Sequence, residues 1–146
     1  MKTDQAKTFD LTVSRVIPGP PDEVYDVWLD SRIPGSIWFG VERAIVNLAV
    51  DGLFYHSVRH ENRSWPHYGR FIRLDRGRAI EHTWVSEATR GIESVVTITL
   101  VAKDGGTEVT LHHANIPDDE MGRGHRDGWT WYLDVLAQRF QKAAAR

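Results

Sequence analysis

His125-Arg-Asp-Gly-Trp-Thr-Trp-Tyr-Leu-Asp-Val-Leu-Ala-Gln-Arg-Phe140 is the stretch of sequence that decides the fold. Four of its apolar residues recur at helical spacing, namely Trp129, Leu133, Leu136 and Phe140. This spacing puts them on one side of a helix, while Asp134, Gln138 and Lys142 are predicted on the opposite, solvated side. A single long helix preceded by many strands predicts a sheet that wraps against that helix, with function in the space between them.

Length and composition predict one domain over residues 1–146, with residues 1–8 as a flexible tail. The chain is 41% hydrophobic and 26% charged, with a net charge of -2, which is typical of a globular protein and argues against a nucleic-acid face. The absence of cysteine excludes disulfides and thiolate ligands. Neither a signal peptide nor a run of roughly 20 apolar residues is seen, so we expect no membrane span and a cytoplasmic location.

The rest of the chain is typical of strands separated by turns. Alternating apolar residues predict a first strand from Phe9 to Ile17, and Arg15 falls on its apolar side, which requires either a bulge or an inward Arg15 with a partner. Pro21 begins a short helix that ends near Asp30, and a second short helical piece is expected in residues 31–40. Six further strands follow, at residues 41–50, 53–60, 65–74, 79–85, 92–102 and 107–113. Short turns between them, including a tight one at Asp51-Gly52, predict an antiparallel meander.

Seven segments together carry a family resemblance: Arg15–Trp28, Asp51–Phe54, Gly69–Asp75, Ile80–Trp84, Gly105–Thr107, Leu111–His113 and His125–Trp129. With them the chain resembles the helix-grip superfamily (SRPBCC) of START domains and pollen allergens, in the branch named after the activator of heat-shock-protein ATPase. The resemblance implies an α+β fold in which a curved, seven-stranded antiparallel sheet grips a long C-terminal helix around an apolar cavity. Two short helices are implied after the first strand. No reaction is implied, because members of this superfamily range from ligand carriers to cyclases and chaperone partners.

Nine aromatic and histidine residues are the candidate ligand-binding residues: Trp38, Phe54, His56, Trp65, Tyr68, His82, Trp84, His113 and Trp129. Trp38 and Trp65 fall at loop edges, where a cavity mouth is expected, whereas ordinary core packing is favoured for Trp129.

Three of these histidines, His56, His82 and His113, share the inward side of three different strands. A meander spaces those strands roughly 9–10 Å apart, which is too far for nitrogens that must each lie about 2 Å from a zinc ion. We therefore predict no metal and no cofactor. The three imidazoles either orient a ligand inside an apolar pocket or are core groups with satisfied hydrogen bonds.

The predicted function is binding of a small hydrophobic or aromatic ligand in the cavity between the sheet and the C-terminal helix. An alternative, ranked second, is an enzyme that cyclises, dehydrates or hydrolyses a hydrophobic substrate through His82, Tyr68 or His56. Tyr68, His82 and Arg15 are together the candidates for a proton-donor set on a polyketide-like carbonyl. A further alternative is a partner of a chaperone ATPase. An exposed sheet edge at Trp65 would favour a homodimer.

Overall fold

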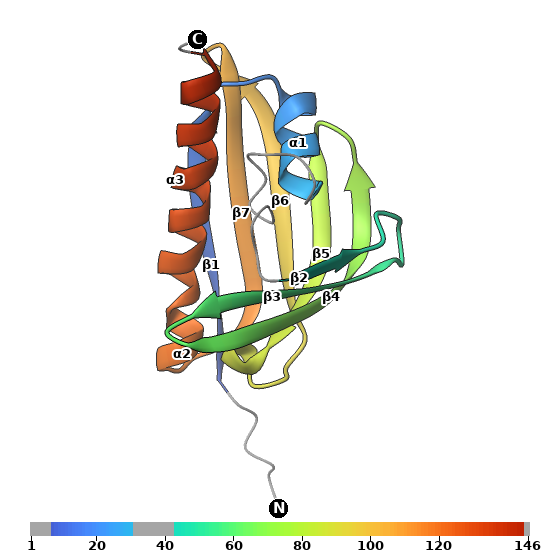
Figure 1. The fold of residues 1–146 in the computed structure, drawn as a ribbon, viewed down its shortest axis with the longest axis vertical. Coiled ribbons are helices and arrows are strands. Elements are labelled where there is room, and N and C mark those ends of the chain that lie inside the picture. The colour runs from blue at the N-terminus through green and yellow to red at the C-terminus, as the bar shows by residue number, and fades with distance from the viewer. Residues whose placement is uncertain (1–6, 31–42, 145–146) are drawn as a thin grey trace, which may run out of the picture.

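The computed structural model describes residues 7–30 and 43–144. Its elements are, in chain order, β1 (Thr8–Ile17), α1 (Pro21–Leu29), β2 (Arg43–Val46), β3 (Leu53–His60), β4 (Arg63–Asp75), β5 (Ala79–Ser86), the 3₁₀ turn η1 (Glu87–Thr89), β6 (Ser94–Lys103), β7 (Gly106–Pro117), α2 (Glu120–Arg123) and α3 (His125–Ala144). Within the described residues the strands form one antiparallel, seven-stranded sheet in the order β1-β7-β6-β5-β4-β3-β2 (Figure 1). The predicted helix-grip fold is confirmed. The second short helix and Trp38 lie outside the described residues.

The sheet is strongly curved because β4 belongs to two differently oriented halves. It pairs with β3 over Arg63–Arg70 and with β5 over His67–Asp75, and its register with β5 shifts between Phe71 and Arg73. Figure 1 shows β2 and β3 running across the direction of β5, β6 and β7. Gly69 lies at this bend, where a Cβ atom would come within 2.2 Å of the Phe54 ring. A glycine here therefore lets the ring pack against the bent strand.

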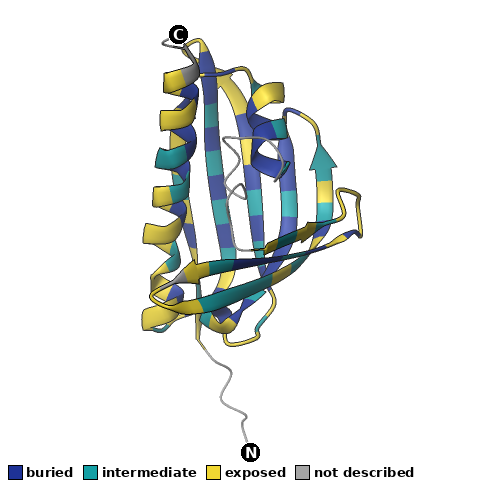
Figure 2. Ribbon diagram, in the orientation of Figure 1, coloured by how far each residue is buried: buried dark blue, intermediate teal, exposed yellow. Residues whose placement is uncertain are grey.

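Helix α3 covers the concave side of the sheet along β1 and buries the predicted stripe. Trp129, Leu133, Leu136 and Phe140 are all at most 8% exposed, and Figure 2 shows the exposed residues of α3 facing away from the sheet. Asp134 is not simply solvated, since its carboxylate pairs with the Arg15 guanidinium on β1 at 2.5 Å. Arg15 therefore has the partner that one of the two alternatives required, although its side chain is 41% exposed.

The tight hairpin turn lies one connection later than predicted. Glu61 and Asn62 both have positive φ (52° and 64°) and join β3 directly to β4, as a primed two-residue turn requires. By contrast, β2 ends at Val46, and residues 47–52 form a wider loop in which the backbone N–H of Asp51 donates to the carbonyl of Phe71. The prediction of a two-residue turn at Asp51-Gly52 was therefore wrong, because this loop is longer and is hydrogen-bonded to β4. The last strand also continues to Pro117, beyond its predicted end.

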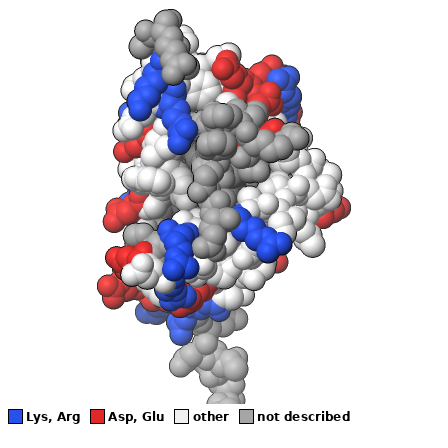
Figure 3. Space-filling model, in the orientation of Figure 1, with Lys and Arg blue, Asp and Glu red and all other residues white. Residues whose placement is uncertain are grey.

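Lysine, arginine and acidic residues are interspersed on the face shown in Figure 3, rather than gathered in a patch of one sign. Among the described helices, none combines the length and apolar character needed to cross a membrane.

Candidate functional site

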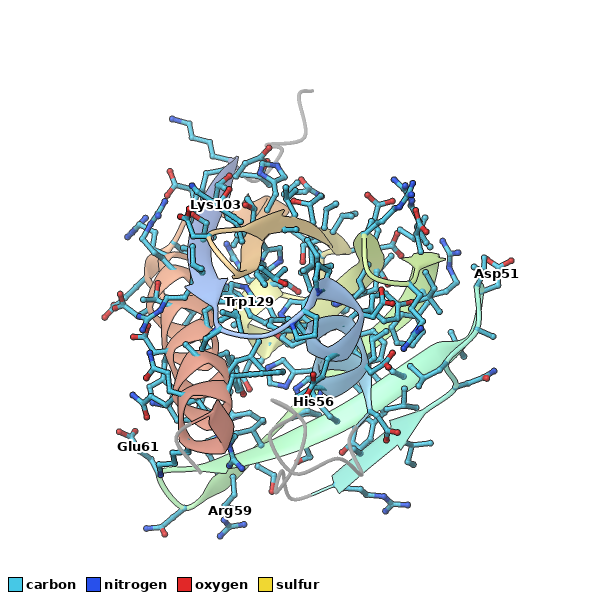
Figure 4. The ribbon with its side chains drawn as sticks, turned by 90° about the horizontal axis from the view of Figure 1, so that it is seen from above. Asp51, His56, Arg59, Glu61, Lys103 and Trp129 are labelled. Atoms are coloured by element: carbon cyan, nitrogen blue, oxygen red, sulfur yellow. The ribbon has the colours of Figure 1, made fainter. Side chains whose placement is uncertain are left out.

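A cavity of about 380 Å³ lies between the β3–β4 hairpin, β5, and the start of α3. Four aromatic residues form much of its wall, namely Trp65, Trp84, Trp129 and Tyr132. Three imidazoles also face it, those of His56, His67 and His125. The remaining lining is apolar or glycine, and no Lys, Arg, Asp or Glu of the described chain lines it. The labelled side chains in Figure 4 show His56 and Trp129 directed into the molecule from the sheet and from α3.

Some of the predicted site residues meet at this cavity and others do not. The lining includes four of them: His56, Trp65, Trp84 and Trp129. Phe54, His82 and His113 are buried behind the lining. Tyr68 is 51% exposed on the convex face of the sheet, where its ring lies 5.2 Å from that of Tyr55.

The sequence reasoning missed His67, His125 and Tyr132, for which signals were present. Phe71 is the buried residue of β4, and counting back from it by twos puts His67 on the inner face and Tyr68 on the outer one. His125 and Tyr132 are four residues before and three after Trp129, so they share its side of the helix.

The buried His113 belongs to a complete hydrogen-bond chain. The Trp129 Nε1–H donates to His113 Nδ1 at 3.0 Å, so the proton of the neutral ring is assigned to Nε2, which lies 2.8 Å from Ser94 Oγ. The Ser94 hydroxyl in turn donates to the carbonyl of Trp84 at 2.5 Å. Burial is the main cause that lowers the pKa of His113 to about 2, with a smaller effect from His125. This imidazole is therefore an uncharged structural link between α3, β6 and β7.

His125, at the start of α3, is fixed in the same way. Its Nδ1–H donates to the carbonyl of Gly122 at 2.9 Å, and its Nε2 accepts a hydrogen bond from the indole N–H of Trp84 at 3.3 Å. Burial lowers its pKa, and the nearby Gly122 carbonyl and Asp119 oppose that effect. Both ring nitrogens are engaged, so His125 holds Trp84 in the cavity wall.

His56 and His67 form the opposite side of the cavity and stack on each other. They are direct neighbours across β3 and β4, with ring centroids 4.5 Å apart and planes 8° from parallel. Desolvation by burial is the largest cause that lowers the pKa of His56 to about 2 and that of His67 to about 4. Both rings are therefore uncharged at neutral pH. The Trp84 ring lies 4.7 Å from that of His67 and extends this aromatic surface.

One nitrogen of His67 is without a hydrogen bond. Its Nδ1 atom is buried and has no partner of suitable geometry among the described residues. The carbonyls of Trp65 and His56 lie close enough to raise its pKa, but that effect is smaller than desolvation.

Trp65 closes the cavity at the tip of the β3–β4 hairpin. The guanidinium carbon of Arg63 lies 3.7 Å from the centre of the Trp65 ring, and Arg63 also forms an ion pair with Glu87 in η1. At Trp65, β4 pairs with Val58 of β3, whereas its pairing with β5 begins at His67. The homodimer suggested for this edge stays a prediction.

The predicted proton-donor set does not assemble. His82 is enclosed by the core, and its Nδ1–H donates to the carbonyl of Thr83 at 2.8 Å. Tyr68 lies on the other face of the sheet, and Arg15 is paired with Asp134. These three residues cannot share a substrate, because β-sheet residues of opposite parity face opposite sides.

The three histidines considered as metal ligands lie on strands that are not neighbours in the sheet. The strands of His56, His82 and His113 are each two positions apart in the sheet order. Within the described residues, no group of three His, Asp or Glu side chains is placed to hold a metal ion.

Comparison with known proteins gives a family and a fold. Residues 18–141 match the family model described as Activator of Hsp90 ATPase homolog 1-like protein. Among solved structures, protein CV1439 from Chromobacterium violaceum superimposes with a TM-score of 0.75 at 23% identity, covering 90% of this chain and 96% of that one. Protein SA2116 from Staphylococcus aureus, of unknown function, gives a TM-score of 0.78 at 11% identity, covering 99% and 100%. Ara h 8.0201 gives 0.75 at 10% identity, covering 93% and 99%. No curated protein sequence gives a significant match.

Proposed function

The chain belongs to the family of Activator of Hsp90 ATPase homolog 1-like proteins, and we propose that it binds a small hydrophobic or aromatic molecule in the cavity between the sheet and α3. The observation that carries this proposal is the cavity itself, about 380 Å³ in volume and walled by indole rings. Pockets that bind small molecules typically measure about 300–1,000 Å³ and combine apolar walls with a few polar groups. Here the polar groups are imidazoles.

Gly128 offers a way to fill the cavity without disturbing the fold. It lies in α3, it lines the cavity, and a Cβ atom added there would meet no atom within 4 Å. Gly128→Phe should therefore place a ring in the ligand space. Gly128→Ala is the matched control, because it leaves the space open and should stabilise the helix by about 1 kcal/mol.

Native mass spectrometry of the purified protein, followed by mass analysis after denaturation, tests the proposal. We expect an added small-molecule mass on the wild type and on Gly128→Ala that disappears on denaturation and is absent from Gly128→Phe. If the wild type is isolated without a ligand, calorimetric titration with 2-naphthol replaces this measurement. We expect 2-naphthol to bind to the wild type and to Gly128→Ala but not to Gly128→Phe. Equal binding to Gly128→Phe and the wild type would show that the ligand lies elsewhere.

A further inference from the structure

Resting on the proposed function, we propose that the cavity selects uncharged aromatic alcohols, whose ring lies among the indoles and whose hydroxyl group meets the stacked pair His56 and His67. The proposed class of ligands is thus narrower than hydrophobic molecules in general. Three features of the cavity lead to it: its lack of charge, the shape of its walls, and the unequal hydrogen bonding of its imidazoles.

The lining supplies no charge to balance an ionised ligand. No described lining residue carries a formal charge at neutral pH, since burial keeps the imidazoles of the cavity uncharged. The cation of Arg63 lies over the Trp65 ring and is already paired with Glu87. A carboxylate or ammonium group moved into such a site loses its hydration without gaining a partner, and that penalty amounts to several kcal/mol.

The walls are suited to a flat ring. The indoles of Trp84 and Trp129 have centroids 5.0 Å apart and are tilted by 54°, and the His67 ring is tilted by 36° to that of Trp84. Tilted rings at these distances present both faces and edges, which are the arrangements that aromatic pairs prefer. Trp65 adds a further indole at the rim.

The position of the polar group follows from which imidazoles already have partners. Both nitrogens of His113 and of His125 are engaged, so neither ring has a free hydrogen-bonding position for a ligand. His67 differs, since it lines the cavity and its Nδ1 has no partner in the described chain. A buried polar atom left without a partner costs about 1–3 kcal/mol, part of which a ligand hydroxyl group that reaches this ring can recover.

A hydroxyl group matches a neutral imidazole better than other polar groups do. The uncharged ring has one N–H donor and one bare acceptor nitrogen, and a hydroxyl both donates and accepts. It therefore pairs with whichever nitrogen faces the cavity, whereas a carbonyl pairs only with the N–H. An aromatic hydrocarbon would leave the nitrogen without a partner.

Calorimetric titration at neutral pH with 2-naphthol, naphthalene and 2-naphthoate tests this selectivity. The three probes share one ring system and differ in the polar group. We expect 2-naphthol to bind about tenfold more tightly than naphthalene, which corresponds to one net hydrogen bond of about 1.4 kcal/mol. We expect it to bind at least about a hundredfold more tightly than 2-naphthoate, because the carboxylate loses its hydration without gaining a partner. In His67→Phe the advantage over naphthalene should fall to about threefold or less, because the ring is kept and its nitrogens are removed. His67→Gln, which restores a donor and an acceptor, should recover part of it.

His112→Phe is the matched control. His112 lies on β7 outside the cavity lining and bonds to Thr12, so its replacement should leave all three affinities unchanged. Binding of 2-naphthoate as tight as that of 2-naphthol would overturn the selection against charge, and equal binding of naphthalene would overturn the role of the hydroxyl. Either result would still be compatible with the proposed binding of aromatic molecules in the cavity. Failure of all three probes to bind the wild type would overturn the proposed function as well.

Discussion

The two sides of the cavity use the same residue type for different purposes. The helix side comprises His125, which lines the cavity, and His113, which is buried behind it, and the hairpin side comprises His56 and His67. Burial is the first cause of a lowered pKa in all four imidazoles. On the helix side every ring nitrogen has a hydrogen-bond partner. On the hairpin side the rings stack, and Nδ1 of His67 has no partner among the described residues.

This difference separates two properties that are often treated together. Burial determines that the imidazoles are uncharged, because desolvation disfavours the protonated ring wherever it occurs. Hydrogen bonding determines what each ring can still do. A ring whose nitrogens are both engaged can only hold the structure together, whereas a ring with an unengaged nitrogen can also meet a ligand.

The largest predicted effect is a loss of folding stability at low pH, which follows from the burial of the imidazoles. The unfolded chain takes up protons on His near pH 6.5, while the folded-state pKa is about 4 for His67 and His82 and about 2 for His56 and His113. The contribution of these neutral imidazoles to the free energy of unfolding is therefore fully present above about pH 6.5. It is lost as the pH falls towards the folded-state pKa values. Each group contributes about 1.4 kcal/mol per pH unit, so the four together remove about 5.6 kcal/mol per unit between about pH 6.5 and pH 4. Urea unfolding at neutral pH and near pH 5 measures the loss.

His82→Leu is the variant that isolates one of these protons. Its surroundings include the rings of Phe54 and Phe71, so leucine suits the site. The slope of the unfolding free energy against pH should fall by about 1.4 kcal/mol per unit, whatever the stability at neutral pH. An unchanged slope would mean that this imidazole can be protonated in the folded protein.

The next effect distinguishes the two sides by packing. Trp129→Ala should lower the free energy of unfolding by about 3–5 kcal/mol, because a fully buried indole is removed and His113 loses its donor. Trp65, on the hairpin side, is only partly buried, so Trp65→Ala should cost less than about 2 kcal/mol while weakening ligand binding. Urea unfolding at neutral pH compares them. Similar losses in the two variants would contradict the assignment of structure to one side and binding to the other.

The sequence predicts the helix side better than the hairpin side. The stripe through Trp129 and Leu136 depends on local spacing along one helix, and short connections suffice to predict the order of the strands. The choice between His67 and Tyr68 in β4 depends on which face of a bent strand is concave, and aromatic residues occur on both faces.

The hydrogen bonds of the site could not be predicted from the sequence, because they join residues that are far apart along the chain. The bond between Trp84 and His125 joins residues that are 41 positions apart. No local pattern encodes such a contact, because it depends on how the curved sheet places β5 against the start of α3. The same holds for the engagement of His113, whose inward direction was predicted but whose partners were not.

A matched pair of phenylalanine variants tests hydrogen bonding directly. His113→Phe leaves the buried Trp129 N–H without its acceptor and removes the partner of the Ser94 hydroxyl, so we expect a loss of about 1–3 kcal/mol. His67→Phe breaks no hydrogen bond of comparable geometry at its Nδ1, and its cost should stay below about 1 kcal/mol. Unfolding curves for both variants provide the measurement. Equal costs would show that the stacked pair is as structural as His113.

The smallest effect concerns the rim of the hairpin side. The side chains of Arg63 and Glu87 are 48% and 50% exposed, so solvent and salt screen their ion pair, and Arg63→Ala should change stability by about 0.5 kcal/mol or less. Binding of 2-naphthol should weaken about twofold, because the guanidinium that lies flat on Trp65 is lost. Arg63→Lys should not restore it, since an ammonium group lacks that planar contact. A tenfold weakening in Arg63→Ala would instead mean that the position of Trp65 depends on Arg63, and that the hairpin side is shaped by its charged rim rather than by the stacked imidazoles.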